Sequence, residues 1–241
     1  MKEIIKVDNI SYTYPDGFKA LKKISFSINK GEKVGIIGAN GAGKSTILKI
    51  LTGLIEAERG TITIDGLKLE KKNLKAIRKK LGLVFQDSDN QLFMNRVYDD
   101  IAFGLRSSKV EKDIVKEEVS KILKSFNIEH LKDKQIYKLS GGEKKNVALA
   151  GIFIMKSEII LMDEPTVSLD PKSRREMINL IKEIPNTSII TSHDLDMILD
   201  VCDRVIVFFD GVISEQGEAF KILSNKKLME ENGLELPLSL Q

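Results

Sequence analysis

The segment "GANGAGKST", residues 38 to 46, constrains the fold more than any other part of this chain. It has the spacing G-x-x-x-x-G-K-[ST], follows the apolar run "KVGIIG" and precedes the helical pattern "STILKILTGL". Glycines let the backbone curl until successive N–H groups point at a phosphate, and a helix start adds about half a positive charge. The segment therefore predicts a strand, a phosphate-binding loop and a helix, in that order.

Two side chains of this loop suit particular atoms of a bound nucleotide. Lys44 supplies a positive charge for the β- and γ-phosphates, and the hydroxyl group of Ser45 suits a Mg²⁺ ion. A glycine turn that matches the spacing by chance is the alternative, and the flanking strand and helix argue against it.

The apolar patterning predicts an α/β fold. Short continuous runs rich in Val and Ile recur between helical patterns, which is typical of a parallel sheet buried on both faces; they lie at residues 33–38, 81–86, 158–163, 187–192 and 204–209. Residues 1–30 and 60–69 alternate in character instead, and Asp65-Gly66 is a turn signal, so they predict a small antiparallel lobe. Asp210-Gly211 predicts a further hairpin.

The stretch between Gln86 and about Lys156 carries no convincing strand pattern and predicts an inserted helical lobe. One helix there is expected to bury a single face, made of Ile114, Val115, Val119, Ile122, Leu123 and Phe126. The basic run from Lys68 to Lys80 is interpreted as a solvated face. Residues 219–241 are expected to form a helix followed by a short extended tail.

Composition narrows the function classes. A chain of 241 residues is expected to form one domain with lobes, and a net charge of +3 is too small to predict a nucleic-acid partner. The single cysteine, Cys202, rules out an internal disulfide and favours a reducing compartment such as the cytosol. Since no apolar window is long enough to span a bilayer, we expect any membrane role to go through a partner.

Polar residues follow three of the predicted core strands, at the sheet edge where ligands bind in open α/β folds. Asp163 and Glu164 come directly after "IILM", so one carboxylate could lie near Mg²⁺ while the other accepts a proton from water. Gln86 and His193 end two further strands, where they could reach Mg²⁺, the attacking water or the γ-phosphate. Solvated acids and a structural histidine are the alternatives.

A second helix start, "LSGGE" at residues 139 to 143, also offers free amides to an anion. One nucleotide needs only one such cradle. Together with "GANGAGKST", Gln86, "IILMDEP", "SLD" at 168 to 170 and His193, this segment makes the chain resemble the ATP-binding subunits of ABC transporters, in that family's motif order. In relatives the "LSGGE" segment contacts the ATP of a second subunit, which implies that the complete site forms only in a pair.

The resemblance implies a P-loop NTPase (RecA-like) core with a mostly parallel sheet, an antiparallel β subdomain and an inserted helical subdomain. The whole chain, 1–241, would be a single ABC ATPase domain. Its parts would be residues 1–86 (the β subdomain and first part of the core), 87–156 (helical subdomain), 157–218 (second part of the core) and 219–241 (C-terminal helix and tail).

The resemblance also implies a role for each motif residue toward ATP and Mg²⁺. Glu164 would be the general base, His193 would bind the γ-phosphate, and Tyr14 would stack on adenine unless it is an ordinary core tyrosine. The phosphates and the metal would be held by Gly38, Asn40, Gly41, Ala42, Gly43, Lys44, Ser45 and Thr46, with Gln86 and Asp163 beside Mg²⁺. The partner's site would be closed by Ser140, Gly141 and Gly142, and Asp170 would bridge the two subunits.

A narrower resemblance concerns partners. The stretches "VFQDSDNQLF", "VYDDIAFGL" and "NGLELPLSL" are similar to the ATPases of energy-coupling-factor importers, which take up vitamins or transition-metal ions. This implies a second ATPase subunit, an integral membrane coupling subunit, a substrate-binding membrane subunit and a place on the cytoplasmic face of the cell membrane. Leu92, Phe93 and Val97 are candidates for the groove that receives the coupling subunit, or are core of the lobe.

Two residues depart from the family's pattern. Asn146 stands where relatives commonly have arginine, and Ser88 replaces a frequent proline after Gln86. Other functions also stay open: the ATPase of another ABC importer class, or a soluble ABC ATPase acting on nucleic acid or ribosomes. A small-molecule kinase would leave "LSGGE" unexplained. The sequence does not decide between a homodimer and a heterodimer.

Overall fold

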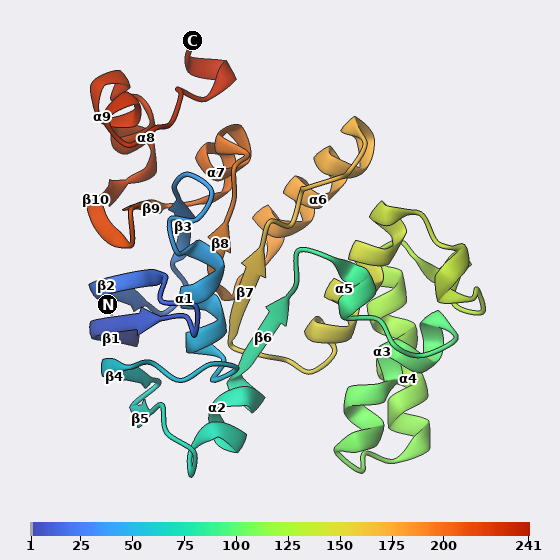
Figure 1. Ribbon diagram of the computed structural model, residues 1–241. Coiled ribbons are helices and arrows are strands. Elements are labelled where there is room, and N and C mark those ends of the chain that lie inside the picture. Colours follow the sequence, from blue (N-terminus) through green and yellow to red (C-terminus); the bar gives the residue numbers. More distant parts are fainter. Residues whose placement is uncertain (1) are drawn as a thin grey trace.

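The computed structural model describes residues 2–241. Within these residues a six-stranded sheet forms the centre, in the order β10-β9-β3-β8-β7-β6 (Figure 1). Its strands are β3 (Lys33–Ile37), β6 (Leu81–Val84), β7 (Ile159–Asp163), β8 (Thr187–Thr191), β9 (Arg204–Phe209) and β10 (Val212–Glu218). Neighbouring strands pair in parallel except β9 with β10, which are antiparallel across the Asp210-Gly211 turn. The predicted α/β core and the last hairpin are confirmed.

A four-stranded antiparallel sheet, in the order β2-β1-β4-β5, packs beside the core. Its strands are β1 (Glu3–Thr13), β2 (Lys19–Asn29), β4 (Arg59–Ile64) and β5 (Leu67–Lys68). The Asp65-Gly66 turn joins β4 to β5, as the sequence predicts.

The helices of residues 2–241 lie between the strands or after the last strand in chain order. They are α1 (Lys44–Leu51), α2 (Leu74–Lys80), α3 (Val97–Ser107), α4 (Lys112–Ser125), α5 (Gly141–Phe153), α6 (Pro171–Glu183), α7 (Leu195–Val201), α8 (Ala219–Leu223) and α9 (Lys226–Glu231). Figure 1 shows α3, α4 and α5 gathered to one side of the core, between β6 and β7 in chain order. No helix in the described part of the chain is long and apolar enough to cross a membrane.

Each face of the central sheet is buried against a different layer because successive side chains of a strand point to opposite faces. On β7, Ile159 and Leu161 join the hydrophobic cluster formed with α1 and the antiparallel sheet. Ile160 and Met162 join the cluster formed with the helices α3 to α8. Continuous apolar strands therefore fill both sides of the sheet.

Some predicted strand ends, one predicted buried residue and the predicted C-terminal helix are wrong. Gln86 does not end a strand, since β6 stops at Val84, and His193 lies two residues beyond the end of β8. On α4, Ile114 is 47% exposed, although the rest of the predicted face is turned inward. Residues 219–241 form two short helices and a 3-10 turn at Leu238–Leu240, not one helix with an extended tail.

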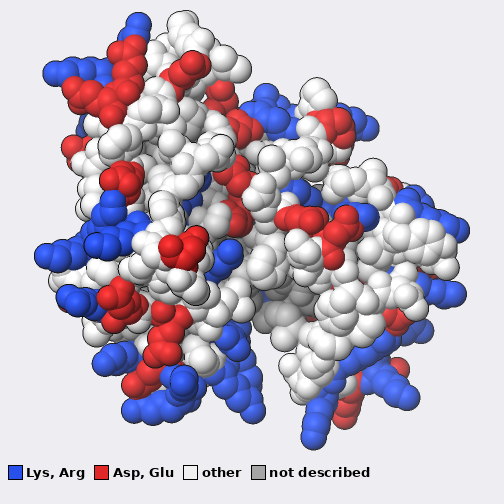
Figure 2. Space-filling view, viewed as in Figure 1, with Lys and Arg blue, Asp and Glu red and all other residues white. Residues whose placement is uncertain are grey.

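The surface carries both signs of charge. Figure 2 shows Lys and Arg projecting at the lower edge of the face in view, and acidic side chains interspersed nearer its middle. In the basic run from Lys68 to Lys80, Ile77 is buried while Lys71, Lys75 and Lys79 are exposed. The interpretation of this run as a solvated face is confirmed.

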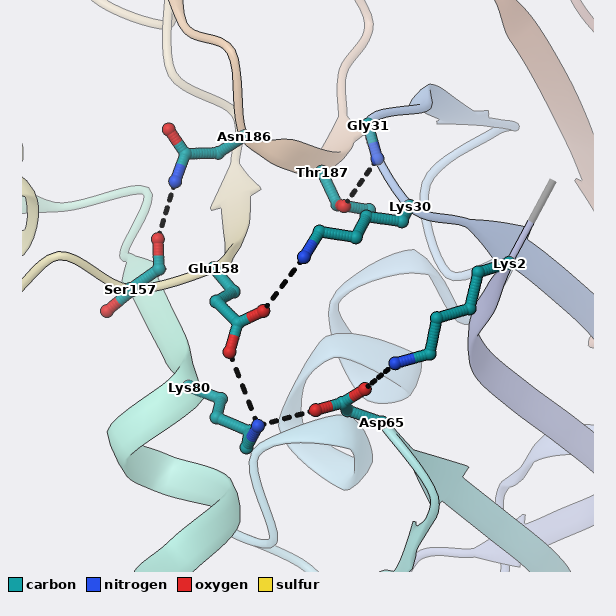
Figure 3. A network of polar contacts seen from close by, with 9 residues as sticks. All are labelled: Lys2, Lys30, Gly31, Asp65, Lys80, Ser157, Glu158, Asn186 and Thr187. Atoms are coloured by element: carbon teal, nitrogen blue, oxygen red, sulfur yellow. Dashed lines mark hydrogen bonds and ion pairs between the residues drawn. The ribbon is translucent and has the colours of Figure 1, made fainter.

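A network of ion pairs joins the two sheets at the amino ends of the parallel strands (Figure 3). Asp65 accepts from Lys2 at 2.7 Å and from Lys80 at 2.5 Å. Glu158, directly before β7, pairs with Lys80 at 3.3 Å and with Lys30 at 3.4 Å. These contacts fasten the β4–β5 turn to the core at the edge opposite the predicted ligand site.

We expect Asp65→Asn to lower the free energy of unfolding near neutral pH, by at most about 1 kcal/mol for such surface pairs. Hydrogen bonds from Lys2 and Lys80 lower the pKa of Asp65 to about 2. A carboxyl group whose pKa is lower in the folded state stabilises the fold at pH values above its unfolded pKa of about 4. This stabilisation is lost as the pH falls toward the folded pKa. The difference between wild type and variant, measured by urea unfolding, should therefore shrink from pH 6 to pH 3.

Asp210→Asn is the matched control, because Asp210 also precedes glycine in a hairpin with positive φ, 45° against 44° for Asp65. Its side chain is 75% exposed and pairs with Lys22. We expect Asp210→Asn to lower the free energy of unfolding at pH 6 by less than Asp65→Asn does. Equal losses for both variants would show that the network adds nothing beyond the turn.

Candidate active site

The loop before α1 has the conformation that the glycine spacing predicts. Gly38, Gly41 and Gly43 have φ of 151°, 79° and 104°. A Cβ on Gly43 would lie 2.6 Å from the backbone oxygen of Ala20. The loop is therefore closed to side chains at this position, and α1 begins immediately after it with backbone N–H groups that have no carbonyl partner within the helix.

Lys44 lies in this loop with a buried side chain, 7% exposed as a residue. Its Nζ donates to the carbonyl oxygens of Gly38 at 2.7 Å and Ala39 at 3.1 Å, and lies 3.1 Å from His193 Nε2. Burial lowers the pKa of Lys44, and the nearby carboxylates of Glu164 and Asp163 oppose that shift. The amine is thus held beside the loop and His193.

A hydrogen-bond chain joins three elements at the carboxyl edge of the sheet. The hydroxyl groups of Ser45 and Thr191 donate to Asp163 Oδ1 at 3.0 and 2.6 Å. Ser45 belongs to α1, Asp163 ends β7 and Thr191 ends β8. The oxygen atoms of Ser45 and Asp163, which the sequence predicts as metal ligands, therefore lie in direct contact.

The Glu164 side chain is buried, with 9% exposed. Its Oε2 accepts from the backbone N–H of His193 at 3.1 Å and from the Ser192 hydroxyl at 3.3 Å. Its Oε1 lies 3.5 Å from His193 Nε2 and has no hydrogen-bond partner among residues 2–241. Because an unsatisfied buried acceptor costs about 1–3 kcal/mol, this oxygen fits a donor that a ligand brings.

Gln86 and Tyr14 lie beside these groups. The exposed Gln86 lines a pocket of about 420 Å³ together with Asp163 and Gly141. The hydroxyl of Tyr14 lies 3.0 Å from Thr46 Oγ1, next to the loop. In the loop itself Asn40 and Gly41 are exposed, whereas Ala42 and Thr46 are buried.

The "LSGGE" segment starts α5 with a capping box. The Ser140 hydroxyl accepts from the Glu143 N–H, and the Glu143 carboxylate accepts from the Ser140 N–H at 2.7 Å. Ser140 and Gly142 line a pocket with Asn146, whereas Gly141 lines the pocket of Gln86 and Asp163. Neither pocket includes any of residues 38–46. The two predicted anion cradles are therefore separate in one copy of the chain.

Two further residues are placed as follows. Asp170 caps α6 by accepting from the N–H groups of Lys172 and Ser173 at 3.0 and 3.1 Å, and it is exposed. Ser88 is buried, and its hydroxyl oxygen has no partner among the residues described.

Sequence reasoning missed two residues of this site. Thr191 holds Asp163, and its place at the end of a strand next to His193 could have indicated it. Lys145 is buried on α5 and donates to the backbone oxygen of Glu164 at 2.8 Å. Its position four residues before the buried Leu149 puts it on an inward face, which is the signal in the sequence.

The residues present suit a hard divalent cation beside a nucleotide. Among residues 2–241 no group of three or more His, Cys, Asp or Glu side chains could hold a metal ion by itself. Mg²⁺ does not require such a group, because it is usually bound by one or two carboxylates together with phosphates and water. The touching oxygens of Ser45 and Asp163 fit that donor set.

Comparison with known proteins decides the family. The profile of the family described as "ABC transporter" matches residues 21–167. The chain belongs to the ABC transporter family. An energy-coupling factor transporter ATP-binding protein of Carboxydothermus hydrogenoformans is 40% identical over 241 residues, with 99% of this chain and 89% of that protein covered.

Solved structures agree with this ABC assignment. CbiO1 of Clostridium perfringens, described as part of the ABC transporter complex CbiONQ, has a TM-score of 0.86 and 38% identity, with 96% and 94% of the chains covered. A dimeric ATP-binding cassette bound to ADP and phosphate has a TM-score of 0.82 and 28% identity, with 90% and 99% covered. The chain is thus an ABC transporter ATP-binding subunit and an ATPase, with the P-loop NTPase fold that the sequence predicts.

We expect Gly43→Ala to lower the free energy of unfolding by about 1–3 kcal/mol, since a left-handed residue with a Cβ is strained. It should also weaken ATP binding, because relieving the contact with Ala20 moves the loop. Urea unfolding and titration with a fluorescent ATP analogue measure both effects.

Gly151→Ala is the control, since Gly151 lies within α5 and a Cβ there meets nothing within 4 Å. It should raise the free energy of unfolding by about 0.5–1 kcal/mol and leave ATP binding unchanged. Unaltered stability and affinity in Gly43→Ala would contradict the role given to the loop.

Proposed function

We propose that this chain is the ATP-hydrolysing subunit of an energy-coupling-factor type importer, where it pairs with a second ATPase subunit around two ATP molecules. The observation that carries this proposal is the separation of the two anion cradles. The pockets that Ser140, Gly141 and Gly142 line contain none of residues 38–46, and in this proposal a second subunit brings such a helix start to the nucleotide. The related cassette that was solved with ADP and phosphate is a dimer.

In this proposal the loop and its neighbours position the nucleotide. The N–H groups at the start of α1 and the Lys44 amine bind the β- and γ-phosphates, and Tyr14 stacks on the adenine. Ser45, Asp163 and Gln86 would hold Mg²⁺, which when bound neutralises phosphate charge. Positioning and charge stabilisation supply most of the catalysis of phosphoryl transfer.

Glu164 and His193 act on the reacting groups. The free oxygen of Glu164 accepts the proton of the attacking water, and the His193 ring, whose Nε2 lies 3.1 Å from the Lys44 amine, contacts the γ-phosphate. Ser140, Gly141 and Gly142 of one subunit close the site of the other, while Asp170 contacts the partner. Loss of the γ-phosphate then removes the contact that joins the two subunits.

The helical segment offers a surface for a membrane partner. Phe93 is 62% exposed and Phe103 is 39% exposed, and their rings meet edge to face with centroids 4.7 Å apart. Two exposed aromatic rings in contact form a small apolar surface, and exposed apolar surface that is contiguous can mark an interaction site. We therefore place an integral coupling subunit at this pair and the chain on the cytoplasmic face of the membrane.

Two of the three groove candidates follow the alternative that the sequence left open, which is core of the helical lobe. Leu92 and Val97 are buried, 8% and 0% exposed, within a hydrophobic cluster that includes the helical segment. Val97 is the first residue of α3 and is one of the buried residues of that helix. Phe93 keeps the role in this proposal.

The proposed cargo is a vitamin or a transition-metal ion, taken up through a substrate-binding membrane subunit. The relative from Carboxydothermus hydrogenoformans is named as an energy-coupling factor subunit, and CbiO1 as part of CbiONQ. Uptake of radioactive cobalt, nickel and vitamins by cells with and without this chain tests the assignment. Dependence of none of these solutes on the chain would contradict it.

Glu164→Gln should lower ATP turnover by about 10² or more, because general-base catalysis contributes about 10²–10⁴. ATP binding should stay near the wild-type level, since the amide keeps the shape of the side chain. The variant should also accumulate as an ATP-dependent dimer in analytical ultracentrifugation. Glu129→Gln, at an exposed position of the helical segment, should change neither property. Unchanged turnover in Glu164→Gln would remove Glu164 from the base role.

Phe93→Asp should reduce the fraction of the chain that sediments with membranes of the source cells, because a charge replaces exposed aromatic surface. The ATPase activity of the purified chain should stay unchanged. Phe220→Asp, at a residue of α8 that is 57% exposed, is the matched control and should remain with the membranes. Equal membrane binding by both variants and the wild type would place the partner elsewhere.

A further inference from the structure

Lys145 is a buried lysine whose side chain crosses from α5 to the core. The residue is 5% exposed, and its Nζ donates to the backbone oxygen of Glu164 at 2.8 Å. The adjacent Lys144 points elsewhere and pairs with Asp89 at 2.5 Å. Of these two neighbouring lysines, only Lys145 contacts the residue proposed as general base.

The backbone of Glu164 needs support at this point. Its φ is 49°, in the left-handed region that is costly for a residue with a side chain. Its N–H donates to the Thr191 oxygen at 3.0 Å, and its oxygen accepts from Lys145 and, at 3.3 Å, from the N–H of Val167. Thr191 anchors the residue from β8, while Lys145 anchors it from α5.

Folding alone does not account for a lysine at this position. Burial lowers the pKa of Lys145 to about 8, against the attraction of the carboxylates of Glu164, Asp163 and Asp87. A buried cation bonded to a neutral oxygen is costly, and an apolar residue of similar volume is often neutral or stabilising in its place. The hydrogen bond that Lys145 donates to the Glu164 oxygen gives this lysine a function that an apolar residue could not supply.

We propose that Lys145 is a positioning residue, which fixes the backbone of Glu164 and thereby aims its carboxylate at the attacking water. This inference rests on the proposed role of Glu164 in ATP hydrolysis. The free Oε1 of Glu164 is then placed by a side chain from outside the core sheet. The position of the Glu164 carboxylate consequently depends on the position of α5. This helix begins with the "LSGGE" segment.

The experiment compares the full-length wild type with Lys145→Met, Lys145→Arg and Lys144→Met. It also includes Glu164→Gln and the double variant Lys145→Met/Glu164→Gln. For each protein, kcat and KM of ATP hydrolysis and the thermal midpoint of unfolding are measured at one protein concentration. Methionine keeps the length and bulk of the lysine stem and removes the donor.

We expect Lys145→Met to lower kcat at least about tenfold, because a small misplacement of a reacting group can cost up to about a hundredfold. Its KM should stay within about twofold and its thermal midpoint should not fall, which a merely structural role would not produce. Lys145→Arg should recover most of the turnover, since it restores a cationic donor. Lys144→Met should resemble the wild type.

The double variant tests the route of action. If Lys145 acts through the Glu164 carboxylate, Lys145→Met should not lower kcat further once Glu164 is glutamine. The inference would be overturned if the double variant lost kcat by the product of the two single losses. A Lys145→Met variant with wild-type kcat would also overturn it. A fall in stability that Lys145→Arg does not reverse would also overturn it. Unchanged turnover in Glu164→Gln would instead overturn the proposed base itself, so the two failures are distinguishable.

Discussion

The two hydrogen bonds that Asp163 Oδ1 accepts, from Ser45 and from Thr191, hold the site together. They connect the first turn of α1 to the ends of β7 and β8, and each of these elements carries a further group of the site. Lys44 precedes Ser45, Glu164 follows Asp163 and His193 lies two residues after Thr191. Fixing one carboxylate oxygen therefore fixes the relative positions of an amine, a second carboxylate and an imidazole. The parallel pairing of β7 with β8 makes this geometry available, because it brings their carboxyl ends to the same edge.

The molecule separates its stabilising contacts from its reactive ones. At the amino ends of the strands, Asp65 and Glu158 are each paired with two lysines. At the carboxyl ends, Glu164 keeps an oxygen without a partner within the described chain and has a left-handed backbone. Unsatisfied and strained groups persist in a fold only when the surroundings hold them. The sheet, buried on both faces, provides that rigid support.

Much of the fold could be predicted from the sequence, because continuous Val and Ile runs and two Asp-Gly turns report local structure directly. The phosphate loop could be predicted because its spacing has a backbone reason. Strand ends are harder to predict, because the apolar run before Gln86 extends to Phe85 although the hydrogen-bond ladder of β6 ends at Val84. His193 likewise lies two residues beyond the end of β8. The burial of Leu92 and Val97 depends on how the helical segment packs, which no local pattern specifies. The spacing of Lys145 from Leu149 indicates an inward position, but the contact of its amine with Glu164 depends on how α5 packs against the core. Comparison with known proteins shows the family and the ATPase activity.

The end of the chain is fastened close to the nucleotide site. Asp196, in the first turn of α7, accepts the backbone N–H groups of Leu238 and Ser239, each at 3.0 Å. Asp194 caps the same helix and is held by the Arg174 guanidinium through two bonds of 2.6 Å. His193 comes immediately before Asp194. One helical turn therefore connects the last residues of the chain, the Arg174 guanidinium and the imidazole beside the phosphate loop.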